Sequence, residues 1–333
     1  MSDLATAVFA AETGSHLVAA PRSVRFDAFR RSFDERGYLE RLRRDGFDWV
    51  GRDDPRFPSR LRAIHDPPPG LFVRAAEPLP PRDAPLVAVV GARACSTYGS
   101  AVAFALGREL GSAGAVVVSG LARGVDAAAH RGALERGRTL AVLGCGIDRD
   151  YPRAHASLAA AIAGRGWIVS EYPPGVEPAP WRFPARNRIV AGLAQAVVVV
   201  EARERSGALI TADLALDEGR EVLAVPGEIT SLLSRGTNAL LRLGATPVTC
   251  VEDVLQAVGL DPPAPAEVSL GEDAAAVRRL VGEGACTVDE LVRGSGLAAA
   301  AVAAALAELE LAGVVAGADG VYREVTPARP TPV

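Results

Sequence analysis

The sequence contains no lysine, so all 36 of its Lys/Arg-type basic side chains are arginine. Arginine binds phosphate through planar, bidentate hydrogen bonds and stacks on bases, although a GC-rich genome also replaces lysine with arginine throughout a protein. The 40 acidic side chains outnumber the arginines and give a formal net charge of −4. A negative net charge does not indicate a nucleic-acid-binding protein, so the places where arginines cluster carry more information than their number.

Cysteine, histidine and aromatic residues are also scarce. The four cysteines lie far apart without a Cys-x-x-Cys pair, which argues against a disulfide framework and against a zinc site. The four histidines show no spacing typical of metal ligands. We therefore expect no metal ion and no cofactor, and we expect the cysteines to be small buried hydrophobic side chains in a reducing cytosol.

Long apolar runs are absent as well. No run of about 18 apolar residues is present, and no basic N-terminal segment precedes an apolar one. The sequence therefore predicts a cytoplasmic protein without a membrane span or a secretory signal. Its length of 333 residues, with 49% hydrophobic and 23% charged residues, predicts a globular chain of two or three domains.

Seven short apolar runs predict the core of the protein. They are five or six residues long, rich in valine and without polar alternation, which is typical of strands buried on both faces of a parallel sheet. The runs are residues 86–90, 115–119, 139–143, 167–171, 196–201, 221–225 and 246–250. Roughly 20–25 residues connect them, enough for crossover helices. We therefore predict an α/β fold with a doubly wound, mostly parallel sheet.

Two further segments flank this predicted sheet. Residues 1–65 are polar, helix-like and rich in arginine, and predict a small helical N-terminal domain before the sheet domain of residues 66–260. Residues 271–325 have the order helix, helix, Ser-Gly turn, helix and hairpin, which is typical of a winged-helix domain. Residues 298–311, its expected recognition helix, contain no arginine, so we predict a protein-contact or regulatory role rather than duplex binding.

The loops after the predicted strands carry the candidate binding residues. Ligands of an open parallel sheet bind outside the carboxyl ends of its strands. Glycines permit close approach there, helix N-termini favour anions and arginines supply positive charge, so phosphate is the expected ligand. The candidates are Gly91, Arg93, Ser96, Tyr98, Gly99, Ser119, Gly120, Arg123, Gly124, Arg153, Phe183, Arg186, Asn187, Arg188, Ser206 and Gly207.

The stretch 181–188, WRFPARNR, carries the densest cluster of these residues. Aromatic rings beside guanidinium groups suit unstacked bases beside phosphates, as single-stranded nucleic acid presents them. Asn187 has two interpretations, a hydrogen bond to a base edge or a helix cap, and Asp126 is either a helix cap or a functional group. No histidine lies beside a nucleophile in the sequence and no carboxylate pair is set up for acid–base chemistry, so no catalysis is predicted.

Several of these motifs together resemble the DNA-processing protein A (Smf) family. The matching stretches are GARACSTYG (91–99), VVSGLARGVDAAAH (117–130), LGCGIDRDYPRAH (143–155), SEYPPG (170–175), FPARNRIVAGL (183–193), the segment 199–227 and GTNALLRLGA (236–245). The resemblance implies an extended Rossmann-like central domain and a cytosolic homodimer. It also implies binding of single-stranded DNA that enters the cell during natural transformation, protection of that strand and help in loading RecA.

The same resemblance assigns roles to individual residues. It places basic pocket residues at Arg93 and Arg153, the family's R-N-R motif at residues 186–188 and a second binding loop around Ser119 and Gly120. Helices around residues 232–243 are the expected dimer interface. These assignments agree with the positions that the strand-end rule selects independently.

Two alternative functions stay open at this point. One is a nucleotide hydrolase similar to the cytokinin-activating LOG enzymes, which use a PGGxGTxxE motif. Here an insert separates Pro226-Gly227 from Gly236-Thr237, and the catalytic glutamate has no obvious counterpart. The other is a sensor that binds a small nucleotide in the pocket and signals through the C-terminal module.

Overall fold

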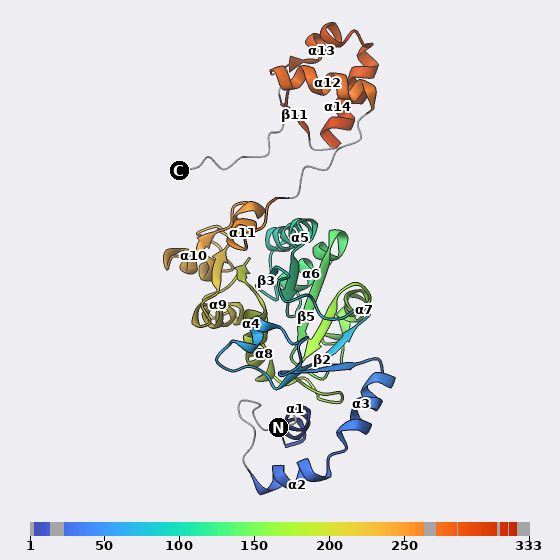
Figure 1. Cartoon of the computed structure of the whole chain (residues 1–333). Helices are drawn as coiled ribbons and strands as arrows, with labels where there is room; N and C mark the ends of the chain where they lie inside the picture. The colour runs from blue at the N-terminus through green and yellow to red at the C-terminus, as the bar shows by residue number, and fades with distance from the viewer. Residues whose placement is uncertain are drawn as a thin grey trace. The chain divides into compact units, whose positions relative to one another are not determined.

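The computed structural model describes residues 3–13, 23–262, 271–284, 286–311, 314–318 and 320–324. The chain divides into two compact units, Met1–Pro263 and Ala264–Val333 (Figure 1). Within the described residues, a nine-stranded sheet covered by helices forms the first unit, and helices with a three-stranded sheet form the second.

The predicted parallel strands form most of the large sheet. They are β3 (Leu86–Val90), β4 (Val116–Ser119), β5 (Arg138–Leu143), β6 (Trp167–Ser170), β7 (Ala196–Val199), β8 (Glu221–Ala224) and β9 (Thr246–Pro247). The sheet order is β1-β2-β6-β5-β4-β3-β7-β8-β9, and every neighbouring pair from β6 to β9 is parallel. The predicted doubly wound α/β fold is confirmed, although β9 has only two residues where a longer strand was expected.

Two strands that the sequence did not indicate extend one edge of this sheet. Strand β1 (Asp48–Gly51) pairs antiparallel with β2 (Gly70–Ala75), and β2 pairs antiparallel with β6. The boundary predicted after residue 65 falls between β1 and β2, so the sheet continues across it. The proline-rich stretch 66–70 resembles a connector in the sequence, and this hides the strand that begins at its last residue.

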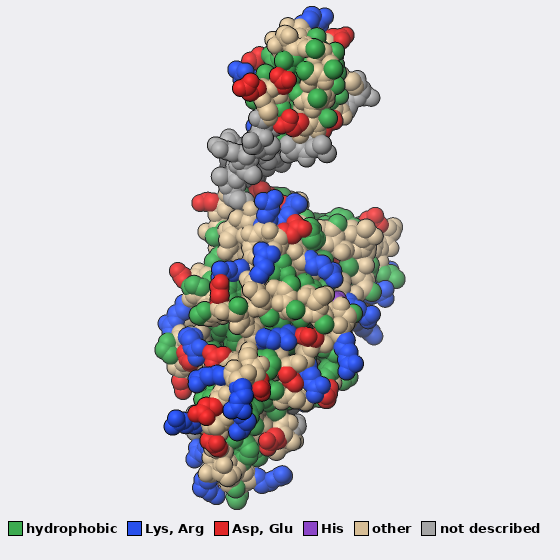
Figure 2. All heavy atoms as spheres, turned by 90° about the vertical axis from the view of Figure 1, so that its right-hand side faces the viewer, with side chains coloured by type: hydrophobic (Ala, Val, Ile, Leu, Met, Phe, Trp, Pro, Cys, Tyr) green, Lys and Arg blue, Asp and Glu red, His purple; other side chains and the backbone are tan. Residues whose placement is uncertain are grey.

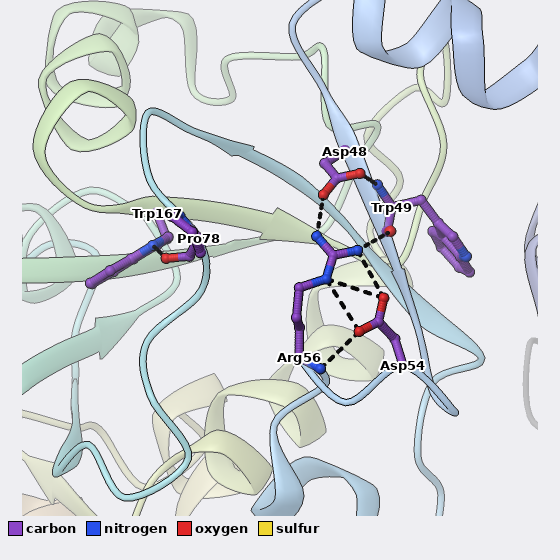
Figure 3. Close-up of polar contacts among 6 residues, drawn as sticks. All are labelled: Asp48, Trp49, Asp54, Arg56, Pro78 and Trp167. Carbon is purple, nitrogen blue, oxygen red and sulfur yellow. Dashed lines mark hydrogen bonds and ion pairs between the residues drawn. The ribbon is translucent and has the colours of Figure 1, made fainter.

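Hydrogen bonds and ion pairs join the segments around β1, β2 and β6 to one another (Figure 3). Arg56, between β1 and β2, donates from Nη1 to Asp48 Oδ2 over 2.6 Å and from Nη2 to Asp54 Oδ2 over 2.8 Å. The indole of Trp167 on β6 donates to the Pro78 carbonyl oxygen over 2.7 Å, which binds the chain after β2 to the sheet. Because the Arg56 side chain is 47% exposed, water screens its ion pairs, and the backbone ladder contributes most of the attachment.

Helices cover both faces of the sheet because successive residues of a buried strand point to opposite sides. Val87 and Val89 pack against the first set of helices, and Ala88 and Val90 pack against the second. The first set is α5 (Thr97–Ser112), α6 (Val125–Arg136), α7 (Ala156–Arg165) and α11 (Val251–Ala257), and the second is α4 (Ser59–Arg62), α8 (Arg182–Leu193), α9 (Gly207–Asp217) and α10 (Arg235–Arg242).

The order in which successive strands are added to the sheet reverses at its centre, between β3 and β7. Strands β3 and β7 are parallel neighbours, yet α5 follows β3 on one face and α9 follows β7 on the other. This reversal is the topological switch point of the sheet. Open α/β folds bind ligands at this point, outside the carboxyl ends of the strands.

The N-terminal helices belong to the same hydrophobic core as the sheet. They are α1 (Asp3–Thr13), α2 (Val24–Ser32) and α3 (Glu35–Arg44). Leu4 of α1 and Leu42 of α3 share a buried cluster with Phe72 of β2. The helices predicted for this part of the chain are therefore present, and their apolar side chains pack on the antiparallel edge.

The second unit is a winged helix, as predicted. Its elements are α12 (Glu272–Glu283), β10 (Cys286–Thr287), α13 (Val288–Ser295), α14 (Ala299–Leu311), β11 (Val315–Ala318) and β12 (Val321–Glu324). Helix α14, in the recognition position, exposes Ala300, Ala303, Ala304 and Ala307. No single helix in the described ranges is long and apolar enough to cross a membrane; α13 and α14 together have the length and composition but meet at 111°.

Helices α5 and α6 pack so closely that glycine is required between them. A Cβ atom on Gly107 of α5 would lie 2.2 Å from the Ala129 carbonyl oxygen. A Cβ atom on Gly132 of α6 would lie 2.0 Å from the Phe104 carbonyl oxygen. Both obstacles are backbone atoms, which cannot rotate away, so these glycines set the separation of the two helices.

We expect Gly107→Val to lower the free energy of unfolding by about 3 kcal/mol, because the two helices must move apart. Gly164 in α7 is the control, since a Cβ atom there meets no atom within 4 Å. Gly164→Ala should leave the free energy of unfolding unchanged or raise it by up to ~1 kcal/mol. Urea unfolding followed by circular dichroism measures both variants, and equal stabilities would contradict the packing argument.

Candidate nucleic-acid interface

A pocket of about 330 Å³ opens at the switch point between β3 and β7. Loops after β3, β4 and β7 line it together with α8, and its lining includes Arg93, Asp126, Arg186 and Gly207. A second hollow of about 230 Å³ adjoins it and shares Arg93, Phe183 and Arg186 with it. Segments that are distant in the sequence thus meet at one rim, as the strand-end rule predicts.

Four exposed arginines line these two hollows, and they are Arg93, Arg123, Arg203 and Arg205. Arg153 is also exposed and lies between Pro152 and Ala154, which line the second hollow, but Arg153 itself lines neither hollow. Within the described part of the chain, none of these arginines lies within 4.0 Å of a carboxylate oxygen in an ion pair. Their guanidinium groups are therefore available to an anionic ligand.

Arg203 and Arg205 were not among the predicted binding residues. They follow β7 directly and line the first pocket beside Ser206 and Gly207, so the rule that selected those two residues applies equally to them. On the face shown in Figure 2, arginines of the first unit are interspersed with acidic side chains instead of forming one patch.

Arg186 lies at the floor of the pocket and is only 4% exposed. Its Nη1 donates hydrogen bonds to the carbonyl oxygens of Gly120 (2.9 Å) and Val142, which ties α8 to the loop after β4 and to β5. Burial lowers the Arg186 pKa, and the nearby negative charge of Asp126 opposes this effect. Arg186 was predicted as a phosphate ligand, but most of its donors are bound within the protein.

Asp126 balances this buried positive charge. Its Oδ2 accepts hydrogen bonds from the N–H groups of Gly120 (3.1 Å) and Ala122 (3.3 Å). Burial raises the Asp126 pKa, and the positive charge of Arg186 opposes the rise. The interpretation of Asp126 as a helix cap is wrong, because Gly124, with φ +75°, occupies the N-cap position of α6.

Asn187 and Arg188 both serve contacts between elements. Asn187 lies in the middle of α8 and cannot cap it; its amide donates to the Gly207 carbonyl oxygen over 3.2 Å. Arg188 donates from Nε to Asp66 Oδ2 (2.8 Å) and from Nη2 to Glu171 Oε2 (2.7 Å). Burial opposes the charged form, but the two carboxylates outweigh it and raise the Arg188 pKa. Arg188 lines neither hollow, so the structure does not bring it to the rim.

Most of the hydroxyl groups predicted at the rim make hydrogen bonds within the protein. Ser96 caps α5 and Ser206, which lines the first pocket, caps α9. The fully buried Ser119 donates to the Val89 carbonyl oxygen over 2.7 Å. Tyr98 is 53% exposed and lines neither hollow. Ser206 differs from the others, because its hydroxyl oxygen accepts the cap hydrogen bond from Ala208 N–H (3.3 Å) and its own O–H can still donate to a ligand in the pocket.

The rim glycines also make room for the protein itself. A Cβ atom on Gly120 would lie 2.2 Å from Arg186 Nη2, so the buried guanidinium fills that space. Gly91 and Gly99 are obstructed by protein atoms in the same way. Gly207 differs, because a Cβ atom there meets nothing within 4 Å and the residue lines the pocket.

Phe183 gives the site its aromatic surface. Its ring lines both hollows and stacks on Tyr151, with centroids 5.3 Å apart and an interplanar angle of 27°. The Arg93 guanidinium carbon lies 5.2 Å from the Phe183 ring centroid. Tyr151 is 42% exposed. The rim therefore combines stacked rings with an adjacent positive charge.

The fold and this site define a Rossmann-like α/β protein with a switch-point pocket suited to an anionic ligand that carries flat rings. The chain belongs to the DNA recombination-mediator protein A family, whose model matches residues 48–259. The DprA winged helix domain matches residues 261–320. The family resemblance inferred from the motifs is confirmed.

Known proteins similar to this chain fall in the same family. A DNA processing protein DprA of Mycobacterium tuberculosis is 47% identical over 246 residues, which cover 71% of this chain and 63% of that protein, less than two thirds of its length. The structure of DprA from Streptococcus pneumoniae matches with a TM-score of 0.65 and 36% identity, over 77% of this chain and 92% of that chain. A Helicobacter pylori DNA processing protein A structure, described for its single-stranded DNA binding mode, matches with a TM-score of 0.56 and 29% identity, over 63% and 94% of the two chains.

We expect Arg188→Met to lower the free energy of unfolding by about 3 kcal/mol or more, because it leaves the buried Glu171 carboxylate without its positive partner. The control is Arg123→Met at the exposed rim, which should change stability by less than about 0.5 kcal/mol. Urea unfolding measures both. A small effect of Arg188→Met would show that the fold does not need this arginine, and Arg188 would again be a candidate for ligand binding.

Proposed function

We propose that the first unit binds single-stranded DNA along the arginine rim of the switch-point pocket and performs no catalysis. The observation that carries this proposal is the set of four exposed arginines without an ion pair that line the two hollows, beside the stacked rings of Phe183 and Tyr151. Guanidinium groups neutralise phosphates, and aromatic rings stack on bases that have no partner strand. The similarity to the Helicobacter pylori protein, whose structure is described for this binding mode, supports the same reading.

The pocket chemistry favours binding over reaction. Asp126 holds two backbone N–H groups of the loop after β4, and no histidine is among the described residues that line the pocket and could activate the Ser206 hydroxyl. Among the described residues, no group of three or more metal-ligating side chains is arranged to hold a metal ion. The rim therefore supplies positive charge and stacking surfaces, which are what a strand-holding site needs.

The proposed biological role follows from the family. In the cytoplasm the protein would protect incoming single strands during natural transformation and help load RecA on them for homologous recombination. The winged helix is proposed to contact protein rather than duplex DNA. Its α14 exposes alanines together with Glu308, and a helix that enters a phosphate-lined groove is usually basic.

The protein is further proposed to act as a homodimer through α9 and α10. A hollow of about 390 Å³ lies between these helices and is lined in part by Leu209, Ile210 and Leu243. Leu243 is 84% exposed, and Ile229 and Leu232, in the connection before α10, are 92% and 54% exposed. Exposed apolar side chains gathered in one place favour burial against a second copy.

We expect Arg93→Ala combined with Arg203→Ala to abolish most single-strand binding at physiological salt, because two phosphate contacts are lost; Arg203 lines the pocket but not the α9–α10 hollow. Fluorescence anisotropy of labelled oligothymidine, and of a duplex of the same length, at several salt concentrations measures this. Each lost phosphate contact should reduce the slope of log affinity against log salt by about 0.7.

The control for this experiment is Arg136→Ala combined with Arg165→Ala. Both arginines are exposed in the last turns of α6 and α7. These turns lead into the amino ends of β5 and β6, whereas the pocket lies at the carboxyl ends of the strands. This pair removes the same formal charge and should change affinity little. Equal binding of single strands and duplex by the unmodified protein, or equal losses in the two double variants, would contradict the proposed site.

We expect Leu243→Glu to convert a dimer to a monomer, because a charged side chain would be buried at the centre of the proposed contact. Val24→Glu on α2 is the control, since Val24 is equally exposed at 84% but distant in sequence and element from the α9–α10 hollow. Sedimentation velocity measures the oligomeric state. A monomeric unmodified protein, or an unaffected dimer in Leu243→Glu, would rule out this interface.

A further inference from the structure

The floor of the first pocket holds a carboxylate oxygen for which the fold supplies no donor. Asp126 is only 6% exposed and lines the pocket, and both of its described hydrogen bonds, from Gly120 and Ala122, go to Oδ2. Within the described part of the chain, Oδ1 accepts no hydrogen bond. Oδ1 is not among the fully buried polar atoms that lack a partner in the described residues, so it is open to the pocket and can accept a hydrogen bond from a ligand there.

A donor group lies at the same floor. Arg186 uses Nη1 for the Gly120 and Val142 carbonyl oxygens, while its Nη2 makes no hydrogen bond to the described residues. Arg186 and Asp126 both line the pocket and do not form an ion pair within 4.0 Å in the described structure. The floor therefore presents one acceptor oxygen and one N–H donor group that are not hydrogen-bonded to each other.

The Watson–Crick edge of every DNA base carries a complementary pair of groups. Each edge has an N–H donor next to an acceptor: N3–H beside O4 in thymine, N1–H beside O6 in guanine, and an amino group beside a ring nitrogen in adenine and cytosine. In a duplex these groups are bound to the opposite base. Only an unpaired base can offer them to a protein pocket.

We propose that Asp126 and Arg186 bind the Watson–Crick edge of one unpaired base, with Asp126 Oδ1 as the acceptor and Arg186 Nη2 as the donor. This inference rests on the proposed single-strand function and adds a specificity-determining pair to it. The phosphates stay outside on the rim arginines, so the carboxylate does not repel them. The pocket volume of about 330 Å³ lies within the range of roughly 300–1,000 Å³ that small-molecule sites occupy, and Phe183 supplies a stacking surface beside it.

This arrangement explains how one site discriminates against duplex without preferring a sequence. Because all four bases carry a donor beside an acceptor, any base that is free of a partner satisfies the floor. A paired base leaves Asp126 Oδ1 without a donor.

The test uses the unmodified protein with two strands that differ in one group. One is oligothymidine, and the other has a methyl group on N3 of every thymine, which removes the donor but keeps the phosphates and rings. We expect the methylated strand to bind about tenfold more weakly, as the loss of one hydrogen bond to a charged group predicts. The salt dependence should be the same for both strands, since the phosphates are unchanged.

The matching protein variant is Asp126→Asn. Its amide oxygen can keep the two backbone hydrogen bonds while its NH₂ group faces the pocket, which replaces the acceptor by a donor. This variant should bind both strands equally. Asp217→Asn, at an exposed site on α9, is the control and should keep the tenfold preference. Thermal unfolding of each variant shows whether the fold is intact.

The possible outcomes separate the two proposals. Equal binding of both strands by the unmodified protein overturns base recognition by Asp126 but leaves the rim as the DNA site. A preference that persists in a folded Asp126→Asn variant means that the methyl group is excluded by shape, and this also overturns the role of Asp126. If the unmodified protein binds neither strand in a salt-dependent way, the proposed single-strand function itself fails.

Discussion

The pocket depends on one buried guanidinium group. A charge in the interior is tolerated only when hydrogen bonds and an opposite charge compensate for the water that it has lost. Arg186 donates hydrogen bonds to the carbonyl oxygens of Gly120 and Val142, and Asp126 supplies the opposite charge. These contacts join the helix α8 to the loop after β4 and to the strand β5. They therefore fix the relative positions of three of the elements on which the pocket is built.

The arginines of this lysine-free chain divide into two groups by burial. Arg186 and Arg188 join elements of the fold, whereas Arg93 and Arg205 face solvent beside the pocket. Arginine suits both tasks because its planar fork donates in several directions and stays charged when it is buried. The same residue type thus builds the scaffold and supplies the surface that meets phosphate.

The sequence predicted the sheet and the rim because both follow from simple rules. Valine-rich runs without alternation identify strands buried on both faces, and the switch-point rule identifies the loops that converge. It could not separate buried from exposed arginines within residues 181–188. That stretch forms part of the helix α8, and residues two apart on a helix point in different directions, so Arg186 and Arg188 do not share a surface. It also missed β1 and β2, because each contains a single valine and β2 directly follows three prolines.

The antiparallel edge has a consequence for the solubility of the folded chain. Strand β2 covers one side of β6, and the carboxylate of Asp66 just before it binds Arg188 on α8. A fragment that began after β2 would leave β6 as an end strand with a row of unpaired N–H and C=O groups. Such a row is a template on which another chain can add a strand. The segment before β3 therefore moves this end of the sheet from β6 to the short strand β1, which keeps β6 paired on both sides.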